Sequence, residues 1–330
     1  MKKAGPFVVL GPAASTFVQD DIRLLKRLSA VTVISTETFG KSVPESVLCV
    51  WRACLSAFTH RTLWIWFADF YSFLPALIFR LLGRRVIVIA GGFDVACFPE
   101  LGHGAWIRWD RRFAVKWTFR MATDIWPVSS YADRLLRQQM PDVKTSVLYL
   151  GVDPSGWQGA DSDEFRQPHT VLGVGFASGK RGIAVKGLDR FIGLARENPD
   201  YQFIWIGTDP AAFKEQDLPL NIQLIGSVQG AGLAGFYQMA AWYVQPSRVE
   251  TFGKAAVEAL LHGCTVIYSP ETALNEVVGD AGYPVAESDW HRFHFADHAL
   301  LPLALCRKRA ALWTVDRREE SIHKRLEGQV

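Results

Sequence analysis

The sequence predicts a protein of the α/β class with two domains in series, each built on a parallel β-sheet. Runs of β-branched and aromatic residues alternate with amphipathic helical patterns along most of the chain, and this alternation is typical of parallel sheets covered by helices. The chain has 330 residues, 49% of them hydrophobic, which is enough for two cores of ordinary size. A stretch rich in Gly, Pro, Asp and Ser between residues 151 and 169 separates the two series.

The first half predicts an N-terminal Rossmann-like domain over residues 1–155. Its expected strands cover 7–10, 31–35, 63–67, 86–90, 125–128 and 147–149, and its expected helices 17–28, 73–82, 105–121 and 132–139. Residues 63–82 are apolar enough to suggest a membrane span, but Asp69 near the middle would cost about 3 kcal/mol there. We therefore expect a strand and a short helix, with Ser72 as the cap and Pro75 in the first turn.

The second half predicts a linker over 156–168 and a second Rossmann-like domain over 169–306. Its expected strands cover 170–174, 203–206, 222–224, 242–244 and 265–268, and its expected helices 188–198, 233–239 and 251–261. Gly263 is the expected C-terminal cap of the last helix. A charged helix over 307–330 is expected to pack back on the first domain. Two such domains create a cleft, and ligands of open α/β sheets bind beyond the carboxyl ends of the strands.

Charge is divided unevenly between the halves. Residues 1–150 hold 19 Lys and Arg against 11 Asp and Glu, whereas residues 151–330 hold 17 against 22. The five cysteines are an odd number with no CxxC pair, which favours a reducing compartment. The apolar run at 7–10 is too short for a signal peptide. We expect a cytoplasmic protein, peripheral at the inner face of a membrane if a membrane is contacted at all.

Membrane contact is suggested by residues 106–120, where three tryptophans are interleaved with basic residues. The tryptophans are Trp106, Trp109 and Trp117, and the stretch ends at Arg120. Such a segment can lie on an anionic membrane surface. It can equally be a helix whose aromatic face packs inward, and the sequence leaves both interpretations open.

The strongest candidate site lies in residues 245–266. Glu250 follows an expected strand, Gly253 precedes an expected helix, and Glu258 lies within that helix. Open amides at a helix N-terminus bind phosphate, and carboxylates on either side can hold hydroxyl groups. This pattern suits a sugar joined to a nucleoside through a diphosphate.

These residues resemble the signature of the retaining glycosyltransferases of family 4, which have the two-domain GT-B fold. The matching positions of the signature are Glu250, Phe252, Gly253, Glu258, Ala259 and Gly263. The resemblance continues in order through further short motifs, which are Val174-Gly175, Lys186-Gly187-Leu188-Asp189, Asn198 to Asp200, Ile206-Gly207, Gly226 to Val228, Asn275 to Val277 and Gly282.

The resemblance implies a role for each matched residue. Glu258 would bind the ribose of the nucleotide, and Glu250 would face the donor sugar. Lys186 would neutralise the leaving diphosphate, because charge builds on its oxygens as the glycosidic bond breaks. The remaining expected donor-binding residues are Thr251, Phe252, Gly253, Lys254, Lys180, Val228 and Gly11.

The chain departs from the family pattern at two positions. Phe176 stands where the family usually has Arg, so either Lys180 or Arg181 supplies the second cation or neither does; we favour Arg181 for its bidentate fork. The usual His after the 86–90 strand is also absent. Asp94 is the expected replacement at the catalytic site, with His103 as the alternative. The expected acceptor-side residues are Gly91, Gly92, His103 and Ser15.

The predicted function is therefore transfer of a hexose from a nucleotide-diphosphate sugar to a hydroxyl group, with retention of configuration. The resemblance places such an enzyme in glycan, lipopolysaccharide or exopolysaccharide assembly, with UDP or GDP in the donor and a glycan or lipid-linked acceptor. No metal or other cofactor is expected, because the site has no DxD-like pair. The alternative is a non-catalytic partner subunit that binds the nucleotide sugar. A dinucleotide-dependent dehydrogenase and a nucleic-acid-binding protein are both disfavoured, since no complete motif for either is present.

Overall fold

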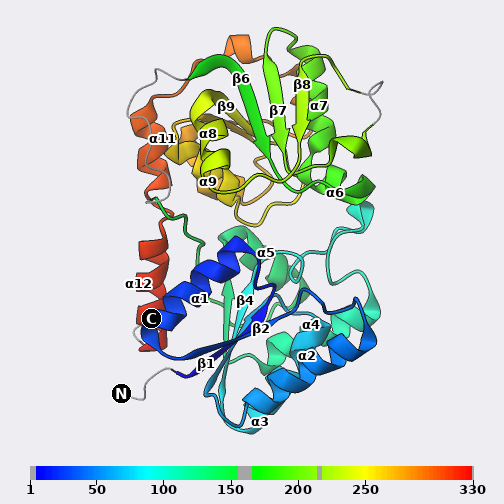
Figure 1. The fold of residues 1–330 in the computed structure, drawn as a ribbon, viewed down its shortest axis with the longest axis vertical. Helices are drawn as coiled ribbons and strands as arrows, with labels where there is room; N and C mark the ends of the chain where they lie inside the picture. The colour runs from blue at the N-terminus through cyan, green and yellow to red at the C-terminus, as the bar shows by residue number, and fades with distance from the viewer. Residues whose placement is uncertain (1–4, 155–165, 214–217, 329–330) are drawn as a thin grey trace. The chain divides into compact units, whose positions relative to one another are not determined.

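The chain forms two compact α/β units in a computed structural model that describes residues 5–154, 166–213 and 218–328 (Figure 1). Unit 1 comprises residues 1–150 and 315–330, and unit 2 comprises residues 151–314. Unit 1 is therefore assembled from two separate parts of the chain. Most of the expected linker, 156–168, lies outside the described residues.

Unit 1 is built on a five-stranded, fully parallel sheet in the order β2-β1-β3-β4-β5. Its strands are β1 (Phe7–Gly11), β2 (Val31–Ser35), β3 (Thr62–Trp66), β4 (Arg85–Ala90) and β5 (Asp124–Pro127). β1 and β3 are buried along their whole length. Strands buried on both faces are continuous apolar runs in sequence. The sequence predicted all five strands, including the edge strand β2, of which only Ile34 is buried.

The helices of unit 1 correct two expectations. They are α1 (Thr16–Leu28), α2 (Val43–Ser56), α3 (Phe70–Leu81), α4 (Trp109–Met121), α5 (Ser130–Gln139) and α12 (Val315–Leu326). Asp69, not Ser72, is the N-cap of α3; Ser72 is the third helical residue and completes a capping box with it. Pro75 consequently lies in the second turn, inside the helix, and not in the first turn. The chain enters the helix earlier because Asp69 offers the stronger cap.

Two further elements differ from prediction. Helix α2 was not expected. The strand expected at 147–149 is extended chain that donates two backbone hydrogen bonds to β5, from Ser146 N to the Ile125 carbonyl and from Leu148 N to the Pro127 carbonyl, without completing a strand pair. The backbone carbonyls of Leu148 and Tyr149 instead accept hydrogen bonds from Arg318 Nη1 on α12, at 3.1 and 2.7 Å. The tail expected to be one helix over 307–330 is divided into α11 (Leu303–Ala310), in unit 2, and α12, in unit 1.

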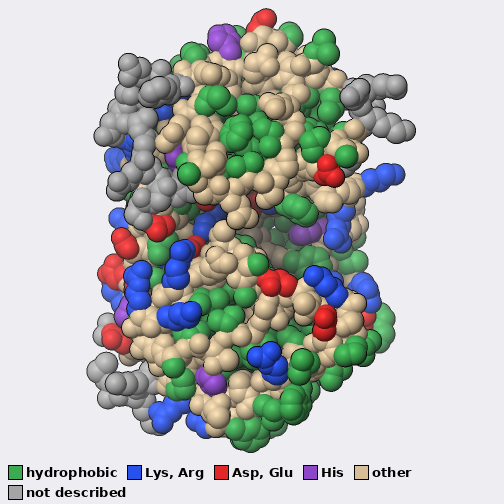
Figure 2. Space-filling view, in the orientation of Figure 1, with side chains coloured by type: hydrophobic (Ala, Val, Ile, Leu, Met, Phe, Trp, Pro, Cys, Tyr) green, Lys and Arg blue, Asp and Glu red, His purple; other side chains and the backbone are tan. Residues whose placement is uncertain are grey.

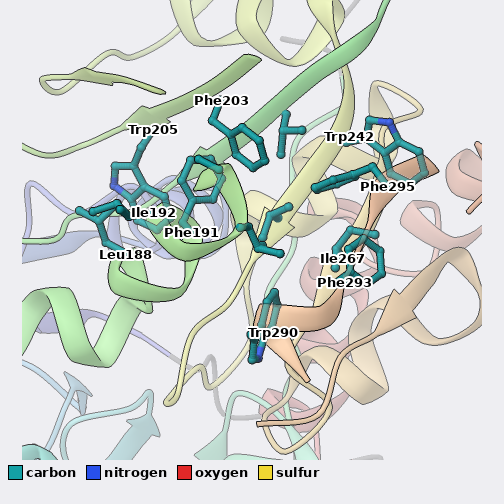
Figure 3. Close-up of a cluster of buried hydrophobic side chains, with 14 of the residues drawn as sticks. Leu188, Phe191, Ile192, Phe203, Trp205, Trp242, Ile267, Trp290, Phe293 and Phe295 are labelled. Carbon is teal, nitrogen blue, oxygen red and sulfur yellow. The ribbon is translucent and has the colours of Figure 1, made fainter. Parts of the chain in front are cut away.

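Unit 2 is built on a six-stranded, fully parallel sheet in the order β11-β10-β9-β6-β7-β8. Its strands are β6 (Gln167–Val174), β7 (Gln202–Ile206), β8 (Ile222–Ile225), β9 (Ala240–Gln245), β10 (Thr265–Tyr268) and β11 (Gly282–Pro284). Only the short edge strand β11 was not predicted. The sheet packs on an aromatic core that includes Phe191, Trp205 and Phe295 (Figure 3).

The helices of unit 2 include one that the sequence did not predict and that bears on the site, α6. They are α6 (Gly179–Lys186), α7 (Leu188–Glu197), α8 (Ala231–Met239), α9 (Lys254–Leu261), α10 (Leu274–Val278) and α11. Short 3-10 turns occur at Pro99–Leu101, Pro210–Ala212, Gly279–Ala281, Trp290–Arg292 and Phe295–Asp297. Gly263 follows the end of α9 with φ 78°, as expected of a glycine that ends a helix. Across the described part of the chain, every helix falls short of the length and apolarity that a membrane span requires.

Candidate functional site

The best candidate site in unit 2 lies at the carboxyl ends of β6 and β9. These two strands are neighbours in the middle of the sheet, and the chain runs from β6 toward β7 on one side and returns to β9 on the other. A reversal of strand order of this kind opens a crevice at the strand ends, where ligands of open α/β sheets bind. Residues that follow β6 and β9 are therefore expected to line this crevice.

A cluster of polar side chains occupies this position. Lys186 Nζ lies 2.9 Å from Glu250 Oε2, and Gln245 Nε2 donates to the same oxygen at 2.8 Å. The Tyr243 hydroxyl in turn donates to Gln245 Oε1 at 3.1 Å. This chain of hydrogen bonds fixes the Glu250 carboxylate, while the Lys186 side chain stays 31% exposed. We call Lys186, Gln245 and Glu250 the strand-end cluster.

Gly187 determines where Lys186 is held. It ends α6 and precedes α7 with φ 71°, and a Cβ atom there would lie 2.0 Å from the carbonyl oxygen of Pro246. Only glycine tolerates both this backbone conformation and this contact. The sequence motif Lys-Gly-Leu thus brings the end of α6 against the loop that carries Glu250.

Glu258 projects from the middle of α9 and is held by a buried tyrosine. The Tyr237 hydroxyl donates to Glu258 Oε2 at 3.1 Å, and Tyr237 is fully buried. Burial, together with the nearby Glu258 carboxylate, raises the pKa of Tyr237 well above its ordinary value, so the hydroxyl stays protonated and able to donate. Glu258 itself is half-buried.

The helix that carries Glu258 begins later than expected. Gly253 is the N-cap of α9 with φ 90°, and Lys254 is its first residue. Thr251 is half-buried in the loop before it, whereas the Phe252 ring is 2% exposed and packs edge-on against Trp313. Phe252 therefore contributes only backbone to the loop, and its side chain belongs to the core of unit 2.

The remaining expected donor residues of unit 2 lie farther from the strand-end cluster. Lys180 and Arg181 are exposed on the first turn of α6, at the opposite end of that helix from Lys186, and Phe176 before them is 77% exposed. Val228 lies half-buried in the loop between β8 and α8. The structure brings Lys186, Glu250 and Gly253 together, but does not bring Lys180, Arg181 or Val228 to them.

Two buried or half-buried arginines beside the cluster were not singled out in the sequence. Arg190 Nη1 donates to the carbonyl of Pro246 at 2.8 Å and to Ser269 Oγ at 3.2 Å, and its side chain is 5% exposed. Burial and the nearby Arg248 lower the pKa of Arg190 to about 10. Arg248 pairs with Asp189 through two hydrogen bonds of 2.8 Å. Both arginines tie the loop after β9 to α7.

In unit 1 the order reverses between β1 and β3, and the expected residues after β1 lie there. Gly11 ends β1 so close to β3 that a Cβ atom would lie 2.6 Å from Trp66 Cβ. Ser15 is the N-cap of α1, although its side chain makes no capping hydrogen bond. Phe67, which follows β3, has φ 63°. A bulky residue in this conformation is strained, and such strain gathers at functional sites; no sequence pattern singled it out.

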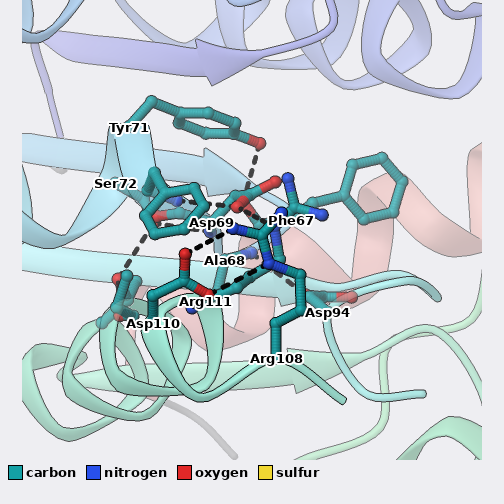
Figure 4. A network of polar contacts seen from close by, with 12 residues as sticks. Phe67, Ala68, Asp69, Tyr71, Ser72, Asp94, Arg108, Asp110 and Arg111 are labelled. Carbon is teal, nitrogen blue, oxygen red and sulfur yellow. Dashed lines mark hydrogen bonds and ion pairs between the residues drawn. The ribbon is translucent and has the colours of Figure 1, made fainter. Parts of the chain in front are cut away.

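Asp94 occupies a different environment from the one expected. It is fully buried, and its carboxylate accepts backbone N–H bonds from Ala68, Gly91 and Gly92 at 2.9 to 3.1 Å (Figure 4). Burial raises the pKa of this carboxyl to about 6, against the opposing effect of those N–H groups. Asp94 joins the loops after β3 and β4 and has no exposed surface with which to touch a sugar.

The other acceptor-side residues lie around the same loops. Gly91 faces the Phe67 ring, so a Cβ atom there would lie 2.3 Å from Phe67 Cε1. The His103 ring meets the Phe93 ring edge-on at 5.4 Å. Arg111 extends from α4 to the Asp69 carboxylate, 3.0 Å away, and its guanidinium lies over the Phe93 ring (Figure 4). The structure thus gathers Gly91, Gly92 and His103 near Phe67 and Phe93.

Residues 177–301 match the family described as Glycosyl transferases group 1. The matched segment lies within unit 2, which is therefore similar to the group 1 glycosyltransferases. The match covers the strand-end cluster, α9 and Glu258, and therefore every residue on which the sequence resemblance depended most. It leaves out unit 1, where the family pattern is looser. A comparison with curated proteins found no match.

Solved glycosyltransferase structures share the fold of the whole chain. Anabaena Alr3699/HepE in complex with UDP and glucose aligns over 98% of this chain and 99% of its own, with a TM-score of 0.68 and 16% identity. Sucrose-phosphate synthase from Thermosynechococcus elongatus aligns over 98% of both chains, with a TM-score of 0.72 and 15% identity. WaaG, a glycosyltransferase involved in lipopolysaccharide biosynthesis, aligns over 98% of this chain and 100% of its own, with a TM-score of 0.70 and 12% identity. The expected GT-B class of fold is confirmed.

Potential metal ligands are not clustered in the described part of either unit. Within residues 5–154, 166–213 and 218–328, no group of three or more His, Cys, Asp or Glu side chains is arranged to hold an ion. The cation that the site does present is the Lys186 ammonium group.

Proposed function

We propose that this chain transfers a hexose from a nucleotide-diphosphate sugar to a hydroxyl group of an acceptor, with retention of the anomeric configuration. The observation that carries the proposal is the strand-end cluster, in which a half-exposed lysine is held by a carboxylate at the point of strand reversal. The family match of the same residues supports it.

In this proposal Lys186 stabilises the departing diphosphate. An ammonium group fixed in advance at the place where charge develops lowers the activation barrier without reorganisation. Glu250 holds Lys186 in that position before the donor binds and then faces the donor sugar. Because Gln245 also donates to Glu250, the carboxylate keeps a partner when Lys186 turns to the phosphate.

The nucleotide is assigned to the start of α9. Glu258 would accept hydrogen bonds from the ribose hydroxyls, with Tyr237 holding the carboxylate in place. The backbone of residues 251–253 and the N-terminus of α9 would receive the sugar or its phosphates, since that end of a helix favours anions. HepE was solved with UDP and glucose, which makes a UDP-sugar the first donor to test.

Retention, the acceptor and the location of the protein are further parts of the proposal. We expect the leaving phosphate to take the acceptor proton, so that no protein base is required, and we expect a glycan or lipid-linked acceptor on the inner side of a membrane. We further expect the reaction to proceed without a divalent metal, so purified enzyme treated with EDTA keeps its activity. Loss of activity in EDTA would contradict this last point.

The first experiment is a thermal-shift and donor-hydrolysis screen with UDP-, GDP- and ADP-sugars. We expect one nucleotide to raise the melting temperature and its sugar to be hydrolysed slowly. Glu258→Ala should abolish the shift, while Glu197→Ala, at the exposed C-terminal end of α7, is the matched control. A shift without hydrolysis or transfer would favour the non-catalytic nucleotide-sugar-binding subunit. No shift with any donor would contradict the proposal.

A further inference from the structure

Exposed large hydrophobic side chains are concentrated on one part of unit 1. Of the 17 found among the described residues, 13 lie between residues 43 and 117, on or beside α2, α3 and α4. Scattered exposed hydrophobics are ordinary, but a contiguous group marks an interaction surface. Figure 2 shows such side chains gathered over α2.

These side chains form a stripe on each helix. On α2 they recur every four residues at Val43, Val47, Trp51 and Leu55, which are 45 to 77% exposed. On α4 the positions Trp109, Phe113 and Trp117 repeat the same spacing and are 37 to 84% exposed. Residues four apart share one face of a helix. Each helix therefore buries one side on the sheet and presents a second apolar side outward.

The three helices join these stripes into one surface, because α3 packs against both α2 and α4. The Phe73 and Phe113 rings meet at 5.9 Å between α3 and α4, and Ser72 is hydrogen-bonded to Thr118 beneath them. Leu74, Leu81 and Leu82 continue the exposed apolar side along α3. We call the exposed hydrophobics of α2, α3 and α4 the three-helix face.

The charges around this face are mostly positive. The three helices carry six Arg or Lys residues against two acidic residues, and one of those two, Asp110, is paired with Arg108 at 2.6 Å. Arg120 and Lys116 line a recess of about 380 Å³ together with residues 139–143, beside Trp117 on α4. A second protein would need a matching acidic and apolar surface, whereas an anionic bilayer supplies both properties over any area.

We propose that the three-helix face docks on an anionic lipid bilayer, with Trp109, Phe113 and Trp117 in the interface and the surrounding cations on lipid phosphates. The arrangement is that of an interfacial, non-spanning contact, in which apolar area and attraction to anionic headgroups act together. It extends the expected segment 106–120 to three helices and corrects it at Trp106, which is buried and donates to the Asp94 carbonyl. It does not depend on the proposed transferase activity.

The test is co-sedimentation of the full chain with vesicles of phosphatidylcholine alone or mixed equally with phosphatidylglycerol. We expect binding to the mixed vesicles that weakens with salt, and little binding to the neutral ones. Replacing Trp109, Phe113 and Trp117 together with Ser should weaken binding at least about tenfold. In the matched control, Leu220, Leu300 and Leu312 of unit 2, which are also exposed, are replaced together with Ser. This variant should bind the vesicles like the wild type.

The cations are tested with Arg112→Glu and Arg120→Glu, which together should weaken binding at least about 25-fold, since each basic residue contributes about fivefold. Arg111 is unsuitable because it pairs with Asp69 and holds α4 to α3. Each variant is accepted only if its circular dichroism melting curve matches the wild type.

Fluorescence gives an independent readout. Trp109 is 84% exposed, so insertion should shift the emission to shorter wavelength and allow quenching by brominated lipid, and Trp109→Phe should reduce both signals. Absence of wild-type binding to mixed vesicles, or unchanged binding by the Ser variant, would overturn the proposal. A concentration-dependent dimer that the Ser variant abolishes, without vesicle binding, would assign the face to a second copy instead.

Discussion

A carboxylate that follows a β-strand has a different environment in each of the two units. In unit 2, Glu250 is paired with the partly exposed Lys186 at the carboxyl ends of the strands. In unit 1, Asp94 is fully buried, and three backbone N–H groups surround it. Unit 2 therefore keeps a charged pair partly exposed, whereas the carboxylate of unit 1 connects two loops in the interior. We expect substitutions to change rate in the first case and stability in the second.

The largest effect is expected from Lys186→Ala. Removing a cation placed for the leaving diphosphate should lower kcat by about 100- to 1,000-fold. Stability should change by less than about 1 kcal/mol, because the pair with Glu250 is partly exposed. Steady-state transfer kinetics and a thermal melt measure the two quantities. Lys144→Ala, an exposed lysine of unit 1, is the control, and a Lys186→Ala enzyme within tenfold of wild type would refute the assignment.

Gly187→Ala tests whether the backbone of unit 2 is as constrained as its side chains. A left-handed alanine costs about 1–2 kcal/mol, and the Cβ contact with the Pro246 carbonyl adds about 1–3 kcal/mol. We expect a loss of about 2–5 kcal/mol in the free energy of unfolding by urea. Gly179→Ala is the matched control, since Gly179 also has a positive φ but a Cβ atom there would meet nothing within 4 Å. This variant should lose only the contribution of the left-handed conformation, about 1–2 kcal/mol. Equal losses would show that the contact with Pro246 does not matter.

Asp94→Asn tests the stability side of the comparison through pH. Burial raises the pKa of Asp94 from 3.8 to about 6, so the folded state binds a proton more tightly than the unfolded state does. Stability contributed by this group is therefore present below pH 3.8 and is lost as pH rises to about 6, by about 3 kcal/mol in all. Asparagine does not titrate, so the stability of the Asp94→Asn variant should not fall between pH 3.8 and about 6 through this group. Unfolding by urea at several pH values measures the difference, and parallel curves for both proteins would contradict the prediction.

Arg190→Met tests how much a buried charge contributes to the stability of unit 2. The substitution leaves the Pro246 carbonyl without its donor and should cost about 2 kcal/mol. Arg248→Met removes a more exposed ion pair with Asp189 and should cost about 1 kcal/mol or less. Thermal melts compare the two. The opposite ranking would show that burial is not what makes Arg190 matter.

Local pattern predicted the sheets well, because a buried parallel strand needs an apolar run whatever its neighbours are. β2 and β10 were predicted to the residue. The strand expected at 147–149 is only partly formed, for a non-local reason. Leu148 N still donates to β5, but the carbonyls of Leu148 and Tyr149 bond with an arginine about 170 positions away in sequence. Helix α2 was missed because its outward side is apolar as well, which removes the contrast on which helical periodicity depends.

The sequence identified site residues that contribute a charged side chain. It did not identify residues that matter through their backbone conformation. Glu250 and Glu258 stand out by type and spacing, and Lys186 was identified through the family resemblance. The structure places Glu250 beside Lys186. Gln245 could have been found as a polar residue at a strand end. Phe67 could not, because a left-handed phenylalanine leaves no mark in the sequence. Asp94 shows the reverse error, since an acidic residue after a strand says nothing of whether its carboxylate points outward.

The return of α12 to unit 1 has a consequence for synthesis on the ribosome. Asp21 on α1 is completely buried, and its carboxylate is paired with Arg318 of α12 at 2.7 and 2.9 Å. Until residue 318 has left the exit tunnel, Asp21 has no cation to compensate its burial, which is costly for an isolated charge. Unit 1 therefore completes its fold only after the whole of unit 2 has been translated.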